Sequence, residues 1–175
     1  DDPFLICAAE QIVRVAEAGN LARAFRLTAD LDLSAAAGFT PIGGAGTPFS
    51  GPLDGPYFAI RGLTISLLGT GNTRLIGASD GAPVPRPQPI DVAVEGGLNT
   101  GALIGSMTGG TVSEVYVTGS ITNTSAQVGG IVGTARSAAL IERSHSSATV
   151  TLSTGTLNAG GLVGVARGQS RIVNS

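Results

Sequence analysis

The sequence predicts an all-β fold, a parallel β-helix (β-solenoid) with one short N-terminal helix. Three observations support this prediction. A glycine-framed apolar pentapeptide occurs three times, as GALIG at 101–105, GGIVG at 129–133 and GGLVG at 160–164. A second apolar element follows each copy at a similar distance. The 175 residues include 27 glycines, and the apolar residues are mostly small or β-branched, which suits closely stacked short strands.

The first element is a predicted helix over residues 7–18. Its apolar residues recur at helical spacing, with charged residues outside that stripe. The stripe consists of Ala9, Ile12, Val13 and Ala16. Gly19 follows, where a glycine often ends a helix. Because an uncovered first coil would expose apolar interior and an unpaired strand edge, we expect this helix to cap it, with Ile12 and Val13 largely buried.

Strands follow the helix. Residues 25–33 alternate between apolar and polar side chains, which predicts a half-buried strand. Residues 38–56 are rich in glycine and proline and are predicted to be loops and turns. The run at 57–68 predicts a strand pair that is broken at Gly62.

The pentapeptides then define a repeat. Each copy ends in a glycine, and a degenerate copy, RLIG at 74–77, supplies an earlier one. These glycines are Gly77, Gly105, Gly133 and Gly164, at intervals of 28, 28 and 31 residues. A period of this size, made of short strands and glycine turns, is typical of a solenoid whose coils stack. Glycine is needed where a coil turns with positive φ or where backbones approach closely.

The second element recurs in phase with the glycines. Residues 111–121 match 140–150, residues 171–175 begin the pattern again, and 90–98 form the first copy after a proline-rich insertion at 82–89. The alternation predicts these inward residues: Val115, Val117, Gly119 and Ile121, and by alignment Ser144, Ser146, Ala148 and Val150. Inward serines must be hydrogen-bonded. On the outer face we expect His145 one coil above Tyr116, with Ala93 one coil below.

The chain is expected to be one continuous domain. Residues 1–70 would form an N-terminal capping segment, and residues 71–175 the repeat coils with the last one truncated. Ile172 should point inward in that last coil, which leaves an apolar end with unpaired backbone groups. We therefore expect further repeats of a longer protein, or another chain associating end to end, to cover this end and to bury Val163 and Ile172.

Several short motifs contain side chains that could carry chemistry. GASDG at 77–81 fits the nucleophile motif G-x-S-x-G around Ser79, but a proline-rich stretch follows where that motif needs a helix. Asp30 and Asp32 share one strand face and could bind a cation or form a glycosidase pair, or be a solvated face beside Arg26.

The remaining candidates stand alone. His145 has no second histidine or cysteine to share a metal, and so is expected to be a surface residue. Cys7, the single cysteine, is either a buried thiol at the helix start or a thiol activated there. Asn123 opens a glycosylation sequon. We predict no catalytic, cofactor-binding or metal-binding residue and no cofactor.

These motifs together resemble the GLUG-motif family of bacterial surface and secreted proteins. GGLVG at 160–164 matches the family pentapeptide, and RIVNS at 171–175 matches its following strand. Upstream segments such as FRLTADLDLS and PFSGPLDG resemble the stretch that commonly precedes the repeats. The resemblance implies a right-handed β-helix rod in large, often adhesive cell-envelope proteins, also found beside IgA-specific metallopeptidases. The chain departs from the family in the insertion at 82–89 and in GALIG, and it has no HExxH zinc motif.

The expected function is a structural and adhesive module, not an enzyme, at the bacterial surface or outside the cell. Its partner would be a host or bacterial receptor or a glycan. The net charge of −2 gives no footprint for nucleic acid, and no apolar run is long enough to span a membrane. Two alternatives remain. A carbohydrate-active β-helix enzyme or binding module would draw on Asp30, Asp32, Asp54 or Asp91, and a filament subunit would associate through the open end.

Overall fold

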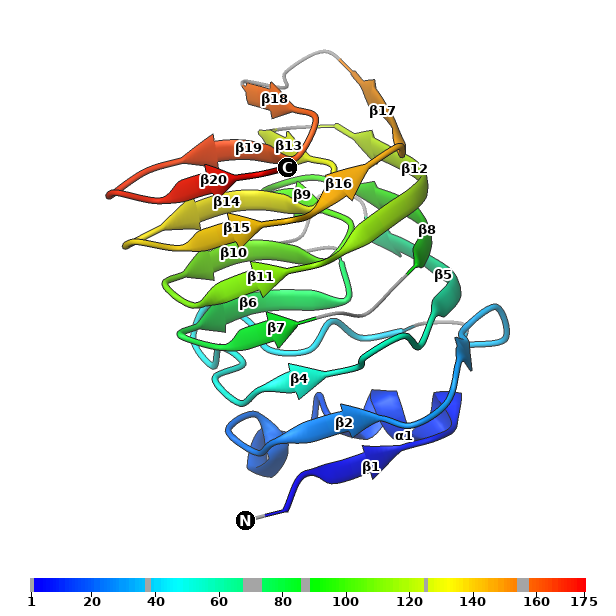
Figure 1. Cartoon of the computed structure of the whole chain (residues 1–175). Helices are drawn as coiled ribbons and strands as arrows, with labels where there is room; N and C mark the ends of the chain where they lie inside the picture. Colours follow the sequence, from blue (N-terminus) through cyan, green and yellow to red (C-terminus); the bar gives the residue numbers. More distant parts are fainter. Residues whose placement is uncertain (1, 37–38, 68–73, 86–88, 125, 154–157) are drawn as a thin grey trace.

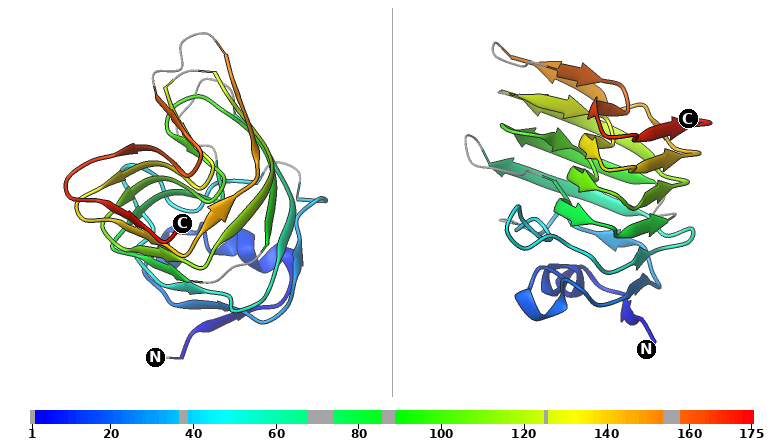
Figure 2. Two further views of the ribbon diagram at one scale, coloured as in Figure 1. Left: turned by 45° about the horizontal axis from the view of Figure 1, so that its top comes forward. Right: turned by 90° about the vertical axis from the view of Figure 1, so that its left-hand side faces the viewer.

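The chain folds into a right-handed parallel β-solenoid that rises from the N-terminus at one end to the C-terminus at the other (Figures 1 and 2). The computed structural model describes residues 2–36, 39–67, 74–85, 89–124, 126–153 and 158–175. Every pairing between its named strands is parallel. The fold class predicted from the sequence is confirmed.

One side of the solenoid, facing the viewer in Figure 1, is a tall ladder of short strands. Its lower part is the sheet of β1 (Phe4–Ile6), β2 (Phe25–Leu27) and β4 (Leu53–Asp54). Its upper part is the sheet of β7 (Pro83–Pro85), β11 (Thr111–Ser113), β15 (Leu140–Glu142) and β20 (Arg171–Val173). Each strand in this ladder belongs to a different coil.

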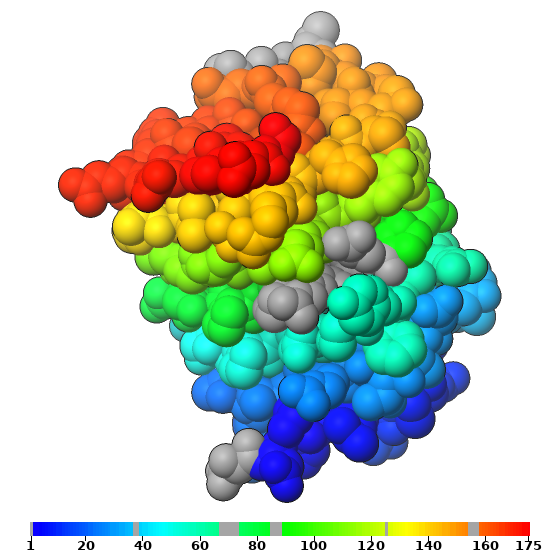
Figure 3. Space-filling view, in the orientation of Figure 1, coloured from blue at the N-terminus to red at the C-terminus, as the bar shows by residue number. Residues whose placement is uncertain are grey.

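A second side carries the longest strands, β5 (Ile60–Leu67), β8 (Ile90–Gly96) and β12 (Tyr116–Asn123). The short strand β3 (Leu31–Asp32) precedes them, and β16 (His145–Ser146) and β17 (Thr149–Leu152) follow in the next coil. Figure 3 shows the coils as successive bands that follow the sequence, from blue at the bottom to orange and red in the upper part.

The third side contains the repeated pentapeptides. In each pentapeptide the chain bends between two strands. The strands before the bend are β9 (Thr100–Gly101), β13 (Gln127–Gly129) and β18 (Asn158–Gly160). The strands after it are β6 (Ile76–Asp80), β10 (Ile104–Thr108), β14 (Val132–Arg136) and β19 (Val163–Ala166). The two sets meet at an angle, so the cross-section is concave here (Figure 2, left).

The register confirms the repeat. Ile104 pairs with Ile76 below it and with Val132 above it, so the RLIG copy is a true member of the series. Val132 in turn pairs with Val163. The second element is also in register, since Val112 pairs with Ile141 and Ile141 with Ile172.

The solenoid interior is apolar and continuous from the first coil to the last covered one. Val115, Val117 and Ile121 are buried, as predicted. Their counterparts one coil higher, Ser146, Ala148 and Val150, are partly buried because the last coil covers them incompletely. Gly119 was predicted to point inward and is exposed; its φ of +103° lies outside the strand region.

The N-terminal helix is shorter than predicted. α1 spans Ala9–Arg14, and a 3₁₀ turn follows at Ala18–Asn20. The Gln11 side chain accepts hydrogen bonds from the backbone N–H groups of Cys7 and Ala8, which fixes the helix start. Asn20 donates from its amide to the Arg14 carbonyl. The predicted glycine ending is therefore wrong, because an asparagine side chain satisfies this helix end and Gly19 has no positive φ.

The helix is part of the first coil, because it lies between β1 and β2, which pair with each other (Figure 1). Its role as a cap stays a prediction. Ile12 is fully buried in the core, but Val13 is 41% exposed, contrary to prediction. Val15 takes the second inward place, because a step of three residues keeps it on the face of Ile12 while Val13 is turned away by one residue.

Ile12→Ala is expected to lower the free energy of unfolding by about 2–4 kcal/mol, since it leaves a cavity under the first coil. Val13→Ala, the matched control one residue away, should cost less than about 1 kcal/mol because its side chain is already half in solvent. Urea titrations measure both. Equal losses at the two positions would contradict this account of the cap.

The leader strands differ from prediction in detail. The alternation over 25–33 is confirmed by burial, but the segment forms two strands, β2 and β3, that belong to different sides of the coil. Within 38–56 the structure adds the short strand β4 to the predicted loops. Residues 60–67 form one strand with a register shift at Gly62, whose φ is +67°. The expected boundary at 70/71 falls within 68–73, outside the described residues.

A repeated corner joins the ladder of β11, β15 and β20 to the next side. Glu114, Arg143 and Asn174 occupy equivalent corner positions, and all three have φ between +48° and +56°. Such a left-handed residue interrupts the backbone ladder. Asparagine tolerates this conformation best, which explains why the asparagine of RIVNS stands at this point of the coil.

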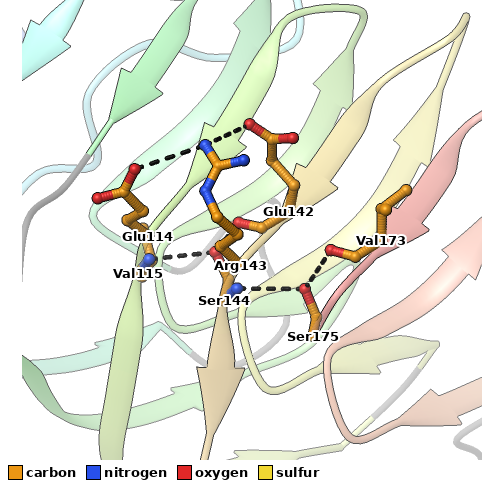
Figure 4. Close-up of polar contacts among 7 residues, drawn as sticks. All are labelled: Glu114, Val115, Glu142, Arg143, Ser144, Val173 and Ser175. Atoms are coloured by element: carbon orange, nitrogen blue, oxygen red, sulfur yellow. Dashed lines mark hydrogen bonds and ion pairs between the residues drawn. The ribbon is translucent and has the colours of Figure 1, made fainter.

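At this corner a serine hydroxyl takes the place of a backbone hydrogen-bond partner (Figure 4). The Ser144 hydroxyl accepts a hydrogen bond from the Val115 N–H of the coil below and donates one to the Glu142 carbonyl of its own coil. Ser175 repeats the arrangement one coil higher, accepting from Ser144 N–H and donating to Val173. The prediction that the inward serines are hydrogen-bonded holds for Ser144 and Ser146, whose hydroxyl accepts from the Ala148 N–H.

Ser144→Ala should therefore lower the free energy of unfolding by about 1–3 kcal/mol, because it leaves the buried Val115 N–H without its partner. Ser170→Ala is the matched control, since the Ser170 hydroxyl bonds only to an exposed turn carbonyl, that of Arg167. Its expected cost is within about 0.5 kcal/mol. Thermal and urea unfolding compare the two; a control as damaging as Ser144→Ala would argue against this role of the hydroxyl.

The outer face agrees with one prediction and corrects another. His145 stacks on Tyr116, with ring centroids 4.2 Å apart and planes inclined by 21°. Ala93 does not lie below Tyr116, because β8 pairs with β12 starting at Ile90 opposite Val117, which places Ala93 opposite Ser120. The predicted insertion at 82–89 is the source of this error, because β7 within it pairs in register with β11 and is therefore the regular start of the second element in this coil.

At the C-terminal end Ile172 continues the inward column of Val112 and Ile141, as predicted, but is 45% exposed. Val163 is half-buried. What covers these side chains stays a prediction.

Candidate binding groove

A polar hollow of about 390 Å³ lies on the concave third side of the solenoid. Its walls come from three successive coils and from a turn in the N-terminal segment that contains Ala45 and Pro48. The described lining residues are Ala45, Pro48, Ala78, Ser79, Asp80, Asn99, Ser106, Thr108 and Arg136. We call it the polar groove. An adjoining hollow of about 630 Å³ shares Ala45 and Asn99 and is lined mainly by small and apolar residues, Leu98 and Pro41 among them.

The repeat itself builds the main wall. Asp80, Thr108 and Arg136 are in register on β6, β10 and β14, so each coil contributes one side chain to a vertical row. Residues one step before them in each strand, such as Met107 and Ala135, are buried in the core. Strand alternation therefore turns the row toward solvent.

A second row runs beside the first. Ser106 lies in register with Ala78 below and Thr134 above. Thr134 donates a hydrogen bond of 2.9 Å to the Asn99 side-chain oxygen, and this contact holds the Asn99 amide at the groove. The floor is a tight turn closed by reciprocal backbone hydrogen bonds between Gly44 and Thr47, with Ala45 inside it.

The groove carries one charge of each sign. Asp80 and Arg136 are both exposed, and neither forms an ion pair within the described part of the chain. Thr108 separates them in the row. The backbones of Asp80 and Arg136 are two strand spacings apart, which is roughly 10 Å. Both charges thus remain available to a ligand.

Ser79 lies at this groove but is not a nucleophile in an elbow. It belongs to β6, the next regular element is strand β7, and its hydroxyl is buried with no hydrogen-bond partner in the described structure. In register Ser79 lies opposite Met107, whose side chain is in the core. The sequence predicted that the prolines after Ser79 prevent the helix that this motif needs, and the geometry agrees with that prediction.

Arg74 is a feature that sequence reasoning missed. Its side chain is fully buried against Gly105, and its three guanidinium nitrogens have no hydrogen-bond partner among the described residues. Burial lowers the pKa of Arg74 from its ordinary value to about 9. The signal was present in RLIG, where an arginine stands at a position that the other copies give to Ala102, Gly130 and Gly161.

The acidic candidates are each engaged locally on outer surfaces. Asp30 accepts a hydrogen bond from Ala59 N–H and pairs with Arg61 at 3.2 Å. Hydrogen bonds from the side chain and then the backbone of Ser34 hold the pKa of Asp32 below its usual value.

Asp54 and Asp91 are also held by neighbours. Asp54 forms an ion pair with Arg26 at 3.5 Å. Arg26 was expected beside Asp30 and Asp32 and is paired with a different carboxylate. Asp91 accepts from the Thr118 hydroxyl. None of these four candidate carboxylates lines the polar groove as described.

The remaining candidates occupy other places. Cys7 is exposed, so the predicted buried thiol is wrong; it precedes the helix cap and its side chain has no core position to fill. His145 is the exposed surface residue that was predicted. Asn123 is fully buried and donates from its amide to the Gly97 carbonyl and the Thr100 hydroxyl, so it serves the core and not a glycan acceptor site.

The described residues contain no helix long and apolar enough to cross a membrane. They likewise hold no group of three or more histidine, cysteine or acidic side chains placed to share a metal ion.

These coils and their groove define a parallel β-solenoid module with a polar concave side. No protein-family model matches the chain. The chain is similar to halomucin of Haloquadratum walsbyi (strain DSM 16790 / HBSQ001), with 34% identity over 186 residues. That alignment covers 98% of this chain and 2% of halomucin, so the chain corresponds to a small part of that protein.

A solved structure shares the fold. It is a crystal structure from Bacteroides ovatus, described as a candidate immunoglobulin A1 protease, with a TM-score of 0.50 over 98% of this chain and 75% of that one. At 16% sequence identity this likeness concerns the fold alone.

Proposed function

We propose that the chain is a non-enzymatic, structural and adhesive β-solenoid module of a bacterial cell-surface or secreted protein. The observation that carries the proposal is the in-register stacking of coils with a common repeat. Such a stack presents a long, regular surface and buries its core with few specialised side chains. The similarity to halomucin over 98% of the chain supports a surface or secreted setting. The GLUG-like pentapeptides support the same class.

The distribution of carboxylates favours a module without catalysis. A glycosidase of the usual kind needs two carboxyl groups across one bond. Among the described lining residues of the polar groove, Asp80 is the single carboxylate. Asp30, Asp32, Asp54 and Asp91 are engaged elsewhere. A carbohydrate-active enzyme is therefore the second candidate, and a filament subunit joined through the C-terminal end is the third.

Fractionation of the source cells with an antibody to this module tests the location, and we expect the protein in the surface or secreted fraction. Incubation of the purified chain with polysaccharides tests for an enzyme, and we expect no new reducing ends and no unsaturated products. A cytoplasmic protein would overturn the first part of the proposal. Product formation that Asp80→Asn abolishes would overturn the second.

A further inference from the structure

We propose that the polar groove binds an uncharged oligosaccharide, which lies across the coils along the row of Asp80, Thr108 and Arg136. The biological setting rests on the proposed surface module, but the binding itself rests on the geometry of the groove. Nothing in the comparisons assigns this site.

Three polar side chains that are accessible to solvent line the row. Asp80 offers a carboxylate acceptor at one end, and Arg136 offers guanidinium donors at the other. The Thr108 hydroxyl lies between them and is half-buried. Because the row crosses three coils, it spans roughly 10 Å. One ligand that touches both ends must be longer than a single sugar ring.

The second row adds directed groups. Ser106 presents a half-buried hydroxyl to the groove. The Asn99 oxygen is occupied by Thr134, so its amide N–H₂ is the part left for a ligand. The groove therefore combines a carboxylate, a guanidinium, an amide and two hydroxyls in one wall. Vicinal hydroxyl groups, which both donate and accept, match this mixture.

Charge narrows the class of ligand. With one acidic and one basic side chain, the described groove attracts neither polyanions nor polycations strongly. A nucleic acid or a sulfated glycan would need several cations. An uncharged glycan needs none, and each charged side chain strengthens a hydrogen bond to it.

A peptide fits less well. β10 is paired on both edges, with β6 and β14, and β14 is paired with β10 and β19. Their backbone groups are therefore already hydrogen-bonded within the sheet, so a peptide could not add as a strand.

No aromatic residue is among the described lining residues, so the stacking that strengthens sugar binding is lacking and the affinity for an oligosaccharide should be weak.

Titrations of the isotope-labelled chain, followed by amide NMR, test the proposal. The probes are linear tetrasaccharides of glucose, xylose, mannose and N-acetylglucosamine, taken to millimolar concentrations. We expect at least one of them to cause saturable shifts at the amides of Ser106, Thr108 and Arg136. In Asp80→Asn and in Arg136→Gln the dissociation constant should rise about tenfold, the loss of one charged hydrogen bond.

Asp32→Asn and Arg171→Gln are the matched controls, since they change the same charges on exposed residues outside the groove. They should leave the dissociation constant unchanged. The proposal is overturned if no probe gives saturable shifts, if the shifts fall outside the groove, or if the groove variants bind as tightly as the wild type. Tighter binding of a heparin tetrasaccharide or of a tetrapeptide would also overturn it. None of these outcomes bears on the cell fractionation, which tests the surface location separately.

Discussion

Gly133→Val is expected to lower the free energy of unfolding by about 3 kcal/mol. An added Cβ at Gly133 would lie 2.6–2.8 Å from backbone atoms of Asn99, Gly105 and Thr100. These atoms belong to the neighbouring coil, and none is the flexible end of a side chain. The strands must therefore separate at the bend, and a urea titration measures the loss. Gly164, with backbone contacts at 2.7–2.8 Å, should behave alike.

The chain offers a matched control within the same motif. Gly161 has no atom within 4 Å of an added Cβ and no positive φ, so Gly161→Val should cost less than about 1 kcal/mol. Gly81 has open space but a φ of +68°, so its substitution meets only the conformational penalty of about 1–2 kcal/mol. Equal losses at Gly133 and Gly161 would refute close coil packing as the reason for the repeat glycine.

Arg74→Met is expected to raise the free energy of unfolding at pH 7 by about 1–4 kcal/mol. The wild-type guanidinium is buried without a partner in the described structure, and methionine fills a similar volume without a charge. Arg171→Met, at an exposed position, is the control and should change little. Destabilisation by Arg74→Met would mean that the guanidinium contributes an interaction that outweighs its burial.

The same residue predicts a dependence on pH. The folded pKa of Arg74 is about 9, well below the ordinary value for arginine. Below pH 9 both the folded and the unfolded chain hold the proton, so the burial penalty is fully present. Between pH 9 and the ordinary pKa of arginine, the unfolded chain binds the proton and the folded chain does not, so wild-type stability rises with pH. The gap between wild type and Arg74→Met, measured by urea titration at several pH values, should narrow above pH 9. A gap that stays constant up to about pH 11 would contradict the lowered pKa.

Much of the fold follows from the sequence, because stacked coils repeat their own register. The glycine intervals placed Ile76, Ile104 and Val132 in one column, and the structure confirms it. Predictions failed where one local contact decided the outcome. Asn20 and Gln11 set the helix ends through side-chain hydrogen bonds, which a periodicity does not reveal. Ala93 was misplaced because residues 82–89 were taken for an insertion, whereas β7 within them pairs in register with β11.

The candidate groove was much less predictable. Asp80, Thr108 and Arg136 are 28 residues apart in sequence, and they become neighbours only through the pairing of β6, β10 and β14. Sequence reasoning looked for clusters along the chain and so weighed Asp30 and Asp32, which the structure shows on an outer surface. A comparison of outward positions in successive repeats would have found the row.

The parallel ladders also determine how the module responds to tension. The hydrogen bonds between neighbouring strands link one coil to the next, so here they run along the solenoid axis. The termini lie at opposite ends of that axis (Figure 1). A pull between them therefore loads the outermost coil first and peels its bonds in sequence, whereas strands sheared along their length would share the load. The coils of the solenoid would detach one after another at low force, so the module would lengthen stepwise under tension.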